Sequence, residues 1–146
     1  MMHPLEAAPS AKELAERGLD ALTRRDLHAL LEIFDPEVVV APLLTGPDTE
    51  VYHGREGAKR WLTEIWATWE SYRATLRWAR EVDESTAVVE LIAKLRRYGS
   101  EVELETTAYG VLEHGGTGRI RSWRFFATEQ EAFDAAESSR ASDAVP

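Results

Sequence analysis

The sequence contains no cysteine, which excludes disulfide bonds and thiolate chemistry. It also has no uninterrupted apolar run long enough to cross a bilayer. Its first residues, MMHPLEAAPSAKELAE, lack the basic and then apolar layout of a secretory signal. We therefore expect a soluble, cytoplasmic protein with no membrane partner.

Basic side chains are scarce relative to acidic ones, at 17 lysines and arginines against 26 aspartates and glutamates. The resulting net charge of −9 opposes association with the phosphate backbone of a nucleic acid. The four histidines also lack the i,i+4 or His-x-His spacing by which one helix or strand binds a metal ion. We expect neither nucleic acid, nor metal, nor another cofactor.

The size and apolar content of the chain suit one domain. Its 146 residues fall in the usual range, and a hydrophobic fraction of 44% is enough for a core. The predicted domain covers 10–137. The small, polar residues of 1–9 and 138–146 predict flexible tails at both ends.

Helices are indicated by capping residues and by apolar periodicity. Two Ser/Thr-x-x-Glu capping boxes, at Ser10 and Thr128, predict a first helix from about Ala11 and a short C-terminal helix. Asp26 predicts a second, short helix by its capping oxygen. Apolar residues at three- and four-residue intervals in 55–69 predict a third, longer helix with a broad aromatic stripe.

Beyond the third helix the apolar period changes from 3.6 to 2, which is typical of strands. Short turns separate four such segments, so the sequence predicts an antiparallel meander. These segments are 72–78, 86–96, 101–113 and 119–127. The β-branched run Val38-Val39-Val40 predicts one more strand, and 43–52 a connecting loop that is a candidate rim or lid.

This order of elements resembles the SnoaL-like branch of the nuclear transport factor 2-like superfamily, over roughly 10–137. The most specific motifs are His53-Gly54-Arg55-Glu56, Gly118-Arg119-Ile120, and Trp123-Arg124-Phe125-Phe126 followed by Thr128-Glu129-Gln130-Glu131-Ala132. The resemblance implies an α+β fold, a cone-shaped half-barrel in which a strongly bent antiparallel sheet wraps around three helices, plus a short C-terminal helix. It also implies an apolar pocket inside the cone. Members of this branch include ketosteroid isomerases, polyketide cyclases and epoxide hydrolases.

The catalytic residues of these relatives have no counterpart in this sequence. The resemblance places the ketosteroid isomerase tyrosine at Gly18, its general-base aspartate at Ala41 and its neutral aspartic acid at Ala108. It places the acid/base aspartate of SnoaL-type cyclases at Phe125. The arginine and aspartates of limonene-type epoxide hydrolases find no match either.

The residues expected to line the pocket come from the third helix, from strands and from the family positions above. They are Gly18, Ala41, Trp61, Leu62, Ile65, Trp66, Thr106, Ala108, Trp123 and Phe125. Tryptophans at helical spacing could bind a flat ligand by stacking, or they could belong to the core or to an oligomer contact.

His53 and Arg121 are the candidate catalytic residues. Arg121 shares a strand face with Trp123 and Phe125, and its planar fork could hold a carboxylate or an enolate oxygen. His53 could carry a proton. The alternatives are that His53 positions the loop before the third helix and that Arg121 lies at an exposed strand end, paired with an acidic residue.

The sequence predicts a small-molecule-binding domain whose pocket accepts a hydrophobic or cyclic ligand. Any reaction would be a weak isomerisation, cyclisation or hydration. The alternative is a non-catalytic dimerisation domain, with outer-face apolar groups such as Trp78, Ile92, Val111 and Phe126 pairing two chains. In either case we expect a homodimer through the sheet.

Overall fold

The computed structural model describes residues 9–42, 51–115 and 117–144, with side chains of the last helix described to 138. Most of the candidate rim or lid, 43–50, lies outside the described residues. So do 1–8 and 145–146, which belong to the two expected tails.

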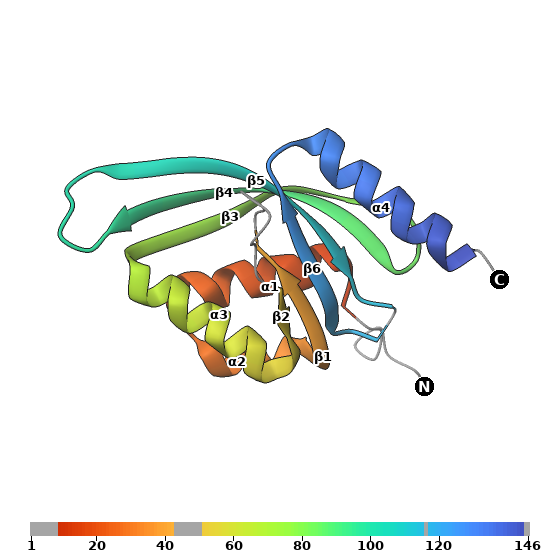
Figure 1. Cartoon of the computed structure of the whole chain (residues 1–146), viewed down its shortest axis with the longest axis horizontal. Helices are drawn as coiled ribbons and strands as arrows, with labels where there is room; N and C mark the ends of the chain where they lie inside the picture. The colour runs from red at the N-terminus through yellow and green to blue at the C-terminus, as the bar shows by residue number, and fades with distance from the viewer. Residues whose placement is uncertain (1–8, 43–50, 116, 145–146) are drawn as a thin grey trace, which may run out of the picture.

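Six strands form one bent sheet in the order β2-β1-β6-β5-β4-β3 (Figure 1). Neighbouring strands are antiparallel except β1 and β6, which run parallel. The bent sheet of an α+β cone is therefore confirmed, and the parallel pair makes the sheet mixed. The strands are β1 (Phe34–Ala41), β2 (Tyr52–His53), β3 (Trp69–Glu81), β4 (Thr86–Arg97), β5 (Glu103–Glu113) and β6 (Ile120–Phe126).

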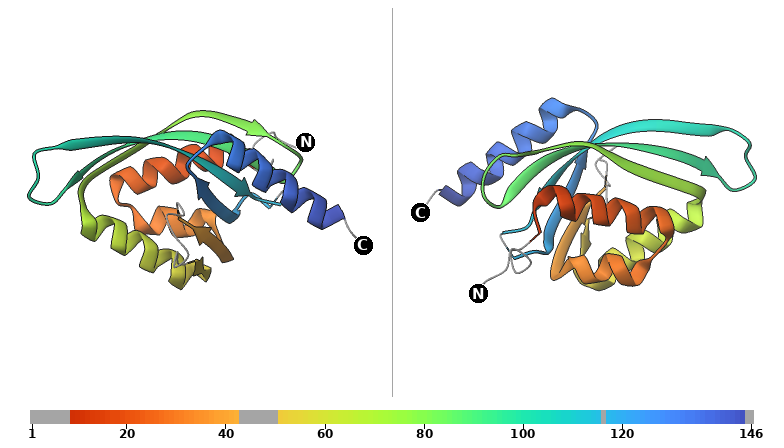
Figure 2. Two further views of the ribbon diagram at one scale, coloured as in Figure 1. Left: turned by 45° about the horizontal axis from the view of Figure 1, so that its top comes forward. Right: turned by 180° about the vertical axis from the view of Figure 1, so that it is seen from behind.

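Three helices lie on the concave side of the sheet and one on its convex side (Figures 1 and 2). The concave side carries α1 (Ala11–Arg24), α2 (Leu27–Ile33) and α3 (Gly54–Thr68), and the convex side carries α4 (Glu129–Ala144). The predicted capping box at Ser10 is present, with both of its hydrogen bonds at 3.1 Å. None of the described helices is both long and apolar enough to span a membrane.

The main core fills the space between the sheet and the first three helices. Its largest fully buried side chains include Leu14, Leu30, Phe34, Leu62 and Ile120. At about 25 cal/mol per Å² of apolar surface removed from water, this burial is the dominant stabilising contribution to the fold.

A second, smaller core lies between α4 and the outer face of the sheet, where Val88 and Val111 pack against Ala132 and Ala136. A register shift in β3 between Leu76 and Trp78 turns Trp78 to this outer face. There Trp78 stacks on Phe133 with ring centroids 6.2 Å apart. Of the apolar groups expected to pair two chains, Trp78, Val111 and Phe126 therefore pack against α4 of the same chain.

The structure also differs from the sequence prediction at β2 and at the end of α4. The two residues of β2, expected to lie at the end of a loop, pair with Val39 and Val40 of β1. Helix α4 continues to Ala144, although a tail was expected from 138. The physical reason is that no glycine or proline occurs in 129–144, so nothing in this segment interrupts a helix rich in alanine.

Candidate functional site

A cavity of about 280 Å³ opens between α3 and the concave face of strands β3 to β6. Its wall is almost entirely apolar. The lining residues are Pro42, Trp61, Ile65, Trp69, Tyr72, Leu91, Ala93, Leu95, Thr106, Ala108 and Phe125.

Strand register explains why these side chains meet. In the sheet, Ala93 of β4 pairs with Thr106 of β5, and Leu91 pairs with Ala108. Tyr72 of β3 pairs with Leu95 in the neighbouring row. Because alternate residues of a strand point to the same face, these rows form one wall. Alanine at two central positions of this wall leaves the space that larger side chains would fill.

Aromatic rings from α3 and β6 close another side of the cavity. The rings of Trp61 and Phe125 lie 6.2 Å apart between centroids and are tilted by 31°. Phe125 in turn stacks on Trp123 at 5.2 Å. Such rings offer a flat ligand a large apolar contact area.

The polar groups of the lining side chains are two hydroxyls, of Tyr72 and Thr106, and two indole N–H groups, of Trp61 and Trp69. Within the described part of the chain these four groups form no hydrogen bond with protein. Burial raises the pKa of Tyr72 to about 12, so its phenol stays neutral and keeps a proton to donate. No carboxylate, imidazole, lysine or arginine side chain is among the described lining residues.

Five of the expected ligand-binding residues lie together at this cavity, namely Trp61, Ile65, Thr106, Ala108 and Phe125. The others are not among the described residues that line it. Leu62 is fully buried in the core. The indole N–H of Trp66 donates to the carbonyl of Leu22 at 3.2 Å, so this residue joins α3 to α1. Ala41 is the last residue of β1, next to Pro42.

Trp123 fills the space in front of two glycines instead of lining the cavity. A Cβ on Gly18 would lie 3.0 Å from Cζ3 of Trp123, and a Cβ on Gly110 would lie 2.4 Å from its Nε1. Trp123 is 2% exposed, and its indole N–H has no hydrogen-bond partner among the described residues. The indole therefore occupies the space next to Gly18, where the resemblance placed a catalytic tyrosine.

The structure places both candidate catalytic residues outside this cavity. His53 is exposed at the N-cap of α3, and its side chain forms no capping hydrogen bond. Arg121 is exposed and lines a separate surface groove with acidic residues that include Asp35 and Glu37. Although Arg121 has the strand parity of Trp123, it lies near the start of β6 against Gly115 of the preceding turn. The structure therefore does not bring these two residues together at the cavity.

Six lining residues were absent from the expected set, namely Pro42, Trp69, Tyr72, Leu91, Ala93 and Leu95. A signal for most of them exists, because Tyr72, Leu91, Ala93 and Leu95 occupy alternate apolar positions of their strands. The alternation of apolar residues identifies the concave face of the sheet. It does not identify which part of that face the helices leave uncovered. Helical spacing predicts that Trp69 belongs to the third helix, whereas it is the first residue of β3.

Comparison with protein families gives one match over most of the chain. The model of the SnoaL-like domain matches residues 15–132. No curated protein matches the sequence significantly. In addition, the described residues contain no group of three His, Cys, Asp or Glu side chains placed to hold a metal ion.

Three solved structures illustrate the likeness of fold. The first is a protein from Catenulispora acidiphila DSM 44928 with a ketosteroid isomerase-like fold, in complex with trimethylamine. It is 17% identical to this chain, with a TM-score of 0.70, and the match covers 82% of this chain and 88% of that one. The second, from Mycobacterium tuberculosis, is in complex with estradiol-17β-hemisuccinate and is 15% identical, with a TM-score of 0.69 and coverage of 82% and 95%.

The third is an epoxide hydrolase from Mycobacterium tuberculosis, 16% identical with a TM-score of 0.62, covering 83% of this chain and 84% of that one. At these identities the likeness establishes the fold, and the function has to be argued from the site.

Proposed function

Because this chain belongs to the SnoaL-like domain family, we propose that it binds a small hydrophobic molecule in the cavity between α3 and the bent sheet. The observation that carries the proposal is the cavity itself, an apolar space walled by aromatic rings and by two alanines. Ligand sites are typically concave and mostly apolar, with a few polar groups that fix orientation.

The cavity's volume and polar groups narrow the class of ligand. Its 280 Å³ lies near the lower end of volumes found for ligand pockets, roughly 300 to 1,000 Å³. This size favours a molecule of one or two rings. The neutral hydroxyl of Tyr72 can donate to a ligand oxygen, and the hydroxyl of Thr106 can donate or accept. The proposed ligand is therefore a compact, uncharged ring compound with one hydroxyl or carbonyl group.

The proposal is binding and not turnover. General acid/base catalysis needs a group that can exchange a proton near neutral pH, and the described lining residues supply none. The nearest substitute, the phenol of Tyr72, has a pKa raised to about 12 by burial and so stays protonated near neutral pH. His53 and Arg121 lie elsewhere and are not assigned to this site.

The structural neighbours support ligand binding in this fold without deciding the ligand. One is in complex with trimethylamine and another with estradiol-17β-hemisuccinate, while a third is an epoxide hydrolase. These proteins differ in what they bind or do, although each is similar in fold to this chain. The ligand of this chain therefore has to be argued from its own cavity side chains.

A homodimer through the sheet and a cytoplasmic location stay predictions. Helix α4 occupies part of the outer sheet face, so a second copy would contact what remains of it. That remainder includes the ion pair between Arg73 and Glu103, at 2.9 Å. Light scattering distinguishes a monomer from a homodimer, and a monomeric mass at working concentration would exclude the dimer.

Two neighbouring threonines give a matched test of the binding proposal. Thr106 and Thr107 are both exposed, but Thr106 lines the cavity and Thr107 lies on the opposite face of β5. We expect Thr106→Phe to abolish the binding of neutral one- and two-ring compounds measured by calorimetry. Thr107→Phe should leave binding unchanged. Equal binding by both variants would overturn the assignment of the cavity.

A further inference from the structure

A second hollow, unrelated to the apolar cavity, is lined by two arginines. This groove has a volume of about 590 Å³ and is formed by His28, Leu31, Glu32, Arg55 and Arg119. It joins α2, the start of α3 and the turn before β6. The chain has a net charge of −9, so a concave surface that carries two positively charged guanidinium groups differs from its overall negative charge.

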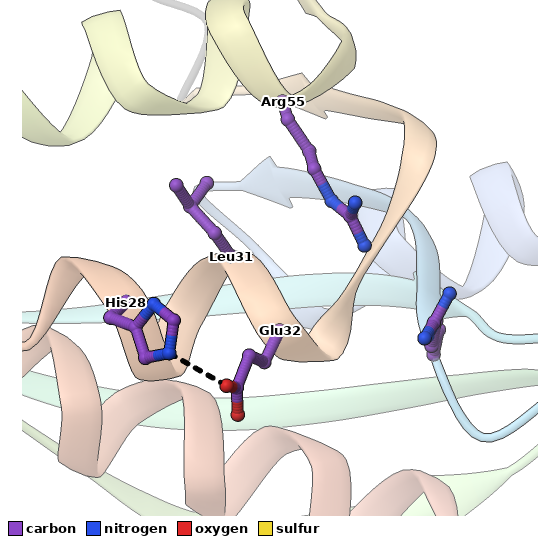
Figure 3. A pocket seen from close by; sticks show the side chains of 5 residues that line it. His28, Leu31, Glu32 and Arg55 are labelled. Atoms are coloured by element: carbon purple, nitrogen blue, oxygen red, sulfur yellow. Dashed lines mark ion pairs between the residues drawn. The ribbon is translucent and has the colours of Figure 1, made fainter.

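Arg55 is held in a fixed orientation at one side of the groove. Its Nε and Nη2 atoms donate to the carbonyl of Phe34 at 3.3 Å and 3.0 Å. Figure 3 shows this side chain extending from α3 toward α2, opposite His28 and Glu32. Its Nη1 group forms no hydrogen bond with any described residue, so a preoriented donor remains available.

Arg119 supplies the second cation. It is exposed and, within the described ranges, its guanidinium forms neither a hydrogen bond nor an ion pair. Among the described residues of the groove the carboxylate is that of Glu32, which faces His28 with Nε2 2.8 Å from Glu32 Oε1 (Figure 3). Leu31 adds an apolar surface between the charged groups.

From this arrangement we propose that the groove binds a small organic oxyanion, a carboxylate or a phosphate monoester, between Arg55 and Arg119, with its apolar part against Leu31. Guanidinium groups suit these anions because their planar forks donate parallel hydrogen bonds to two oxygens. This site is independent of the cavity ligand and takes a molecule of opposite character, charged where the other is neutral.

The test uses three probes with the same ring: benzoate, phenyl phosphate and uncharged benzyl alcohol. NMR of the full chain resolves arginine Nε–H and tryptophan indole N–H signals, so it separates this groove from the apolar cavity. We expect the two anions, but not benzyl alcohol, to shift the signals of Arg55 and Arg119 saturably. The anion that binds more tightly then identifies the class.

Arg119→Gln should weaken anion binding about tenfold, since a hydrogen bond to a charged group is among the stronger kinds. The fold should tolerate this variant because the guanidinium of Arg119 has no described partner to lose. Arg17→Gln, on the exposed face of α1, removes the same charge and should have no effect. Equal losses in the two variants, or shifts that never saturate, would overturn the proposal and leave only diffuse charge attraction.

Discussion

Gly110 of β5 and Trp123 of β6 fit together so closely that no other residue can replace the glycine without movement. A Cβ at position 110 would lie 2.4 Å from Nε1 of Trp123 and 3.2 Å from Val89. Trp123 and Val89 are both buried, so neither side chain can move into solvent to make room for a Cβ. The glycine therefore serves close packing, because it leaves room for the indole beside Phe125 at the cavity wall.

Gly110→Ala should destabilise the protein by about 2 to 3 kcal/mol, since overpacking a buried site forces neighbouring groups from their positions. Urea denaturation measures this loss. In a Trp123→Phe background, which lacks the indole N–H, the cost of the same substitution should be much smaller. An unchanged cost in that background would show that the clash is not with Trp123.

Arg25 connects the end of α1 to the end of α3. Its guanidinium donates to the carbonyls of Trp66 and Glu70 at 3.0 Å and 2.9 Å, and also to that of Trp69. These carbonyls lie at or just beyond the last turn of α3, where backbone acceptors lack helical partners. Arg25 thus caps a neighbouring helix while its own backbone adopts the left-handed conformation that ends α1, with φ of 58°.

We expect Arg25→Ala to lower the free energy of unfolding by about 1 to 2 kcal/mol. Arg25→Lys should lose most of the same stability, because an ammonium group cannot bridge several carbonyls as a fork does. The neighbouring Arg24→Ala breaks only exposed ion pairs and should cost less than about 0.5 kcal/mol. A similar loss for Arg24→Ala and Arg25→Ala in thermal denaturation would argue against the cap.

Tyr72 should make stability depend on pH in the alkaline range. Its pKa rises from 10.0 in the unfolded chain to about 12 in the fold, because burial disfavours the phenolate. The unfolded state therefore loses the proton first. The contribution of Tyr72 is intact below pH 10 and is lost as the pH rises toward 12.

Comparing denaturation at about pH 9 and about pH 11 captures about half of this effect, which amounts to roughly 3 kcal/mol at full ionisation. Tyr72→Phe should lose less stability between these pH values than the unmodified protein. Some alkaline dependence should persist, because a hydrogen bond to Glu90 also raises the pKa of Tyr109. Identical pH dependence with and without the Tyr72 hydroxyl would contradict the burial of this group.

The order of elements could be predicted from sequence because local signals agree with the fold. The capping boxes at Ser10 and Thr128 form as expected, and the alternating segments become β3 to β6. The parallel pairing of β1 with β6 could not be predicted, since it joins distant segments and depends on the sheet bending. Nor could the register shift in β3, because strict alternation gives no sign of an irregularity between Leu76 and Trp78.

The candidate site was predictable only in part. Helical periodicity identified Trp61 and Ile65, but it also selected Trp66, whose indole bonds to the α1 backbone instead. Ile65 and Trp66 are adjacent on α3, but the first lines the cavity and the second contacts α1. Helical periodicity does not resolve a difference of one residue. Likewise strand parity grouped Arg121 with Phe125, although the cavity does not extend to the start of β6.

The indole N–H signals of the five tryptophans test the central claim directly, because each reports a different environment. Titration with a library of neutral one- and two-ring compounds should yield at least one that moves the signals of Trp61 and Trp69 saturably. The same compound should leave Trp78 unmoved, since that ring lies on the other face of the sheet under α4. If no compound shifts Trp61 and Trp69, or if Trp78 shifts equally, the cavity is not a ligand site.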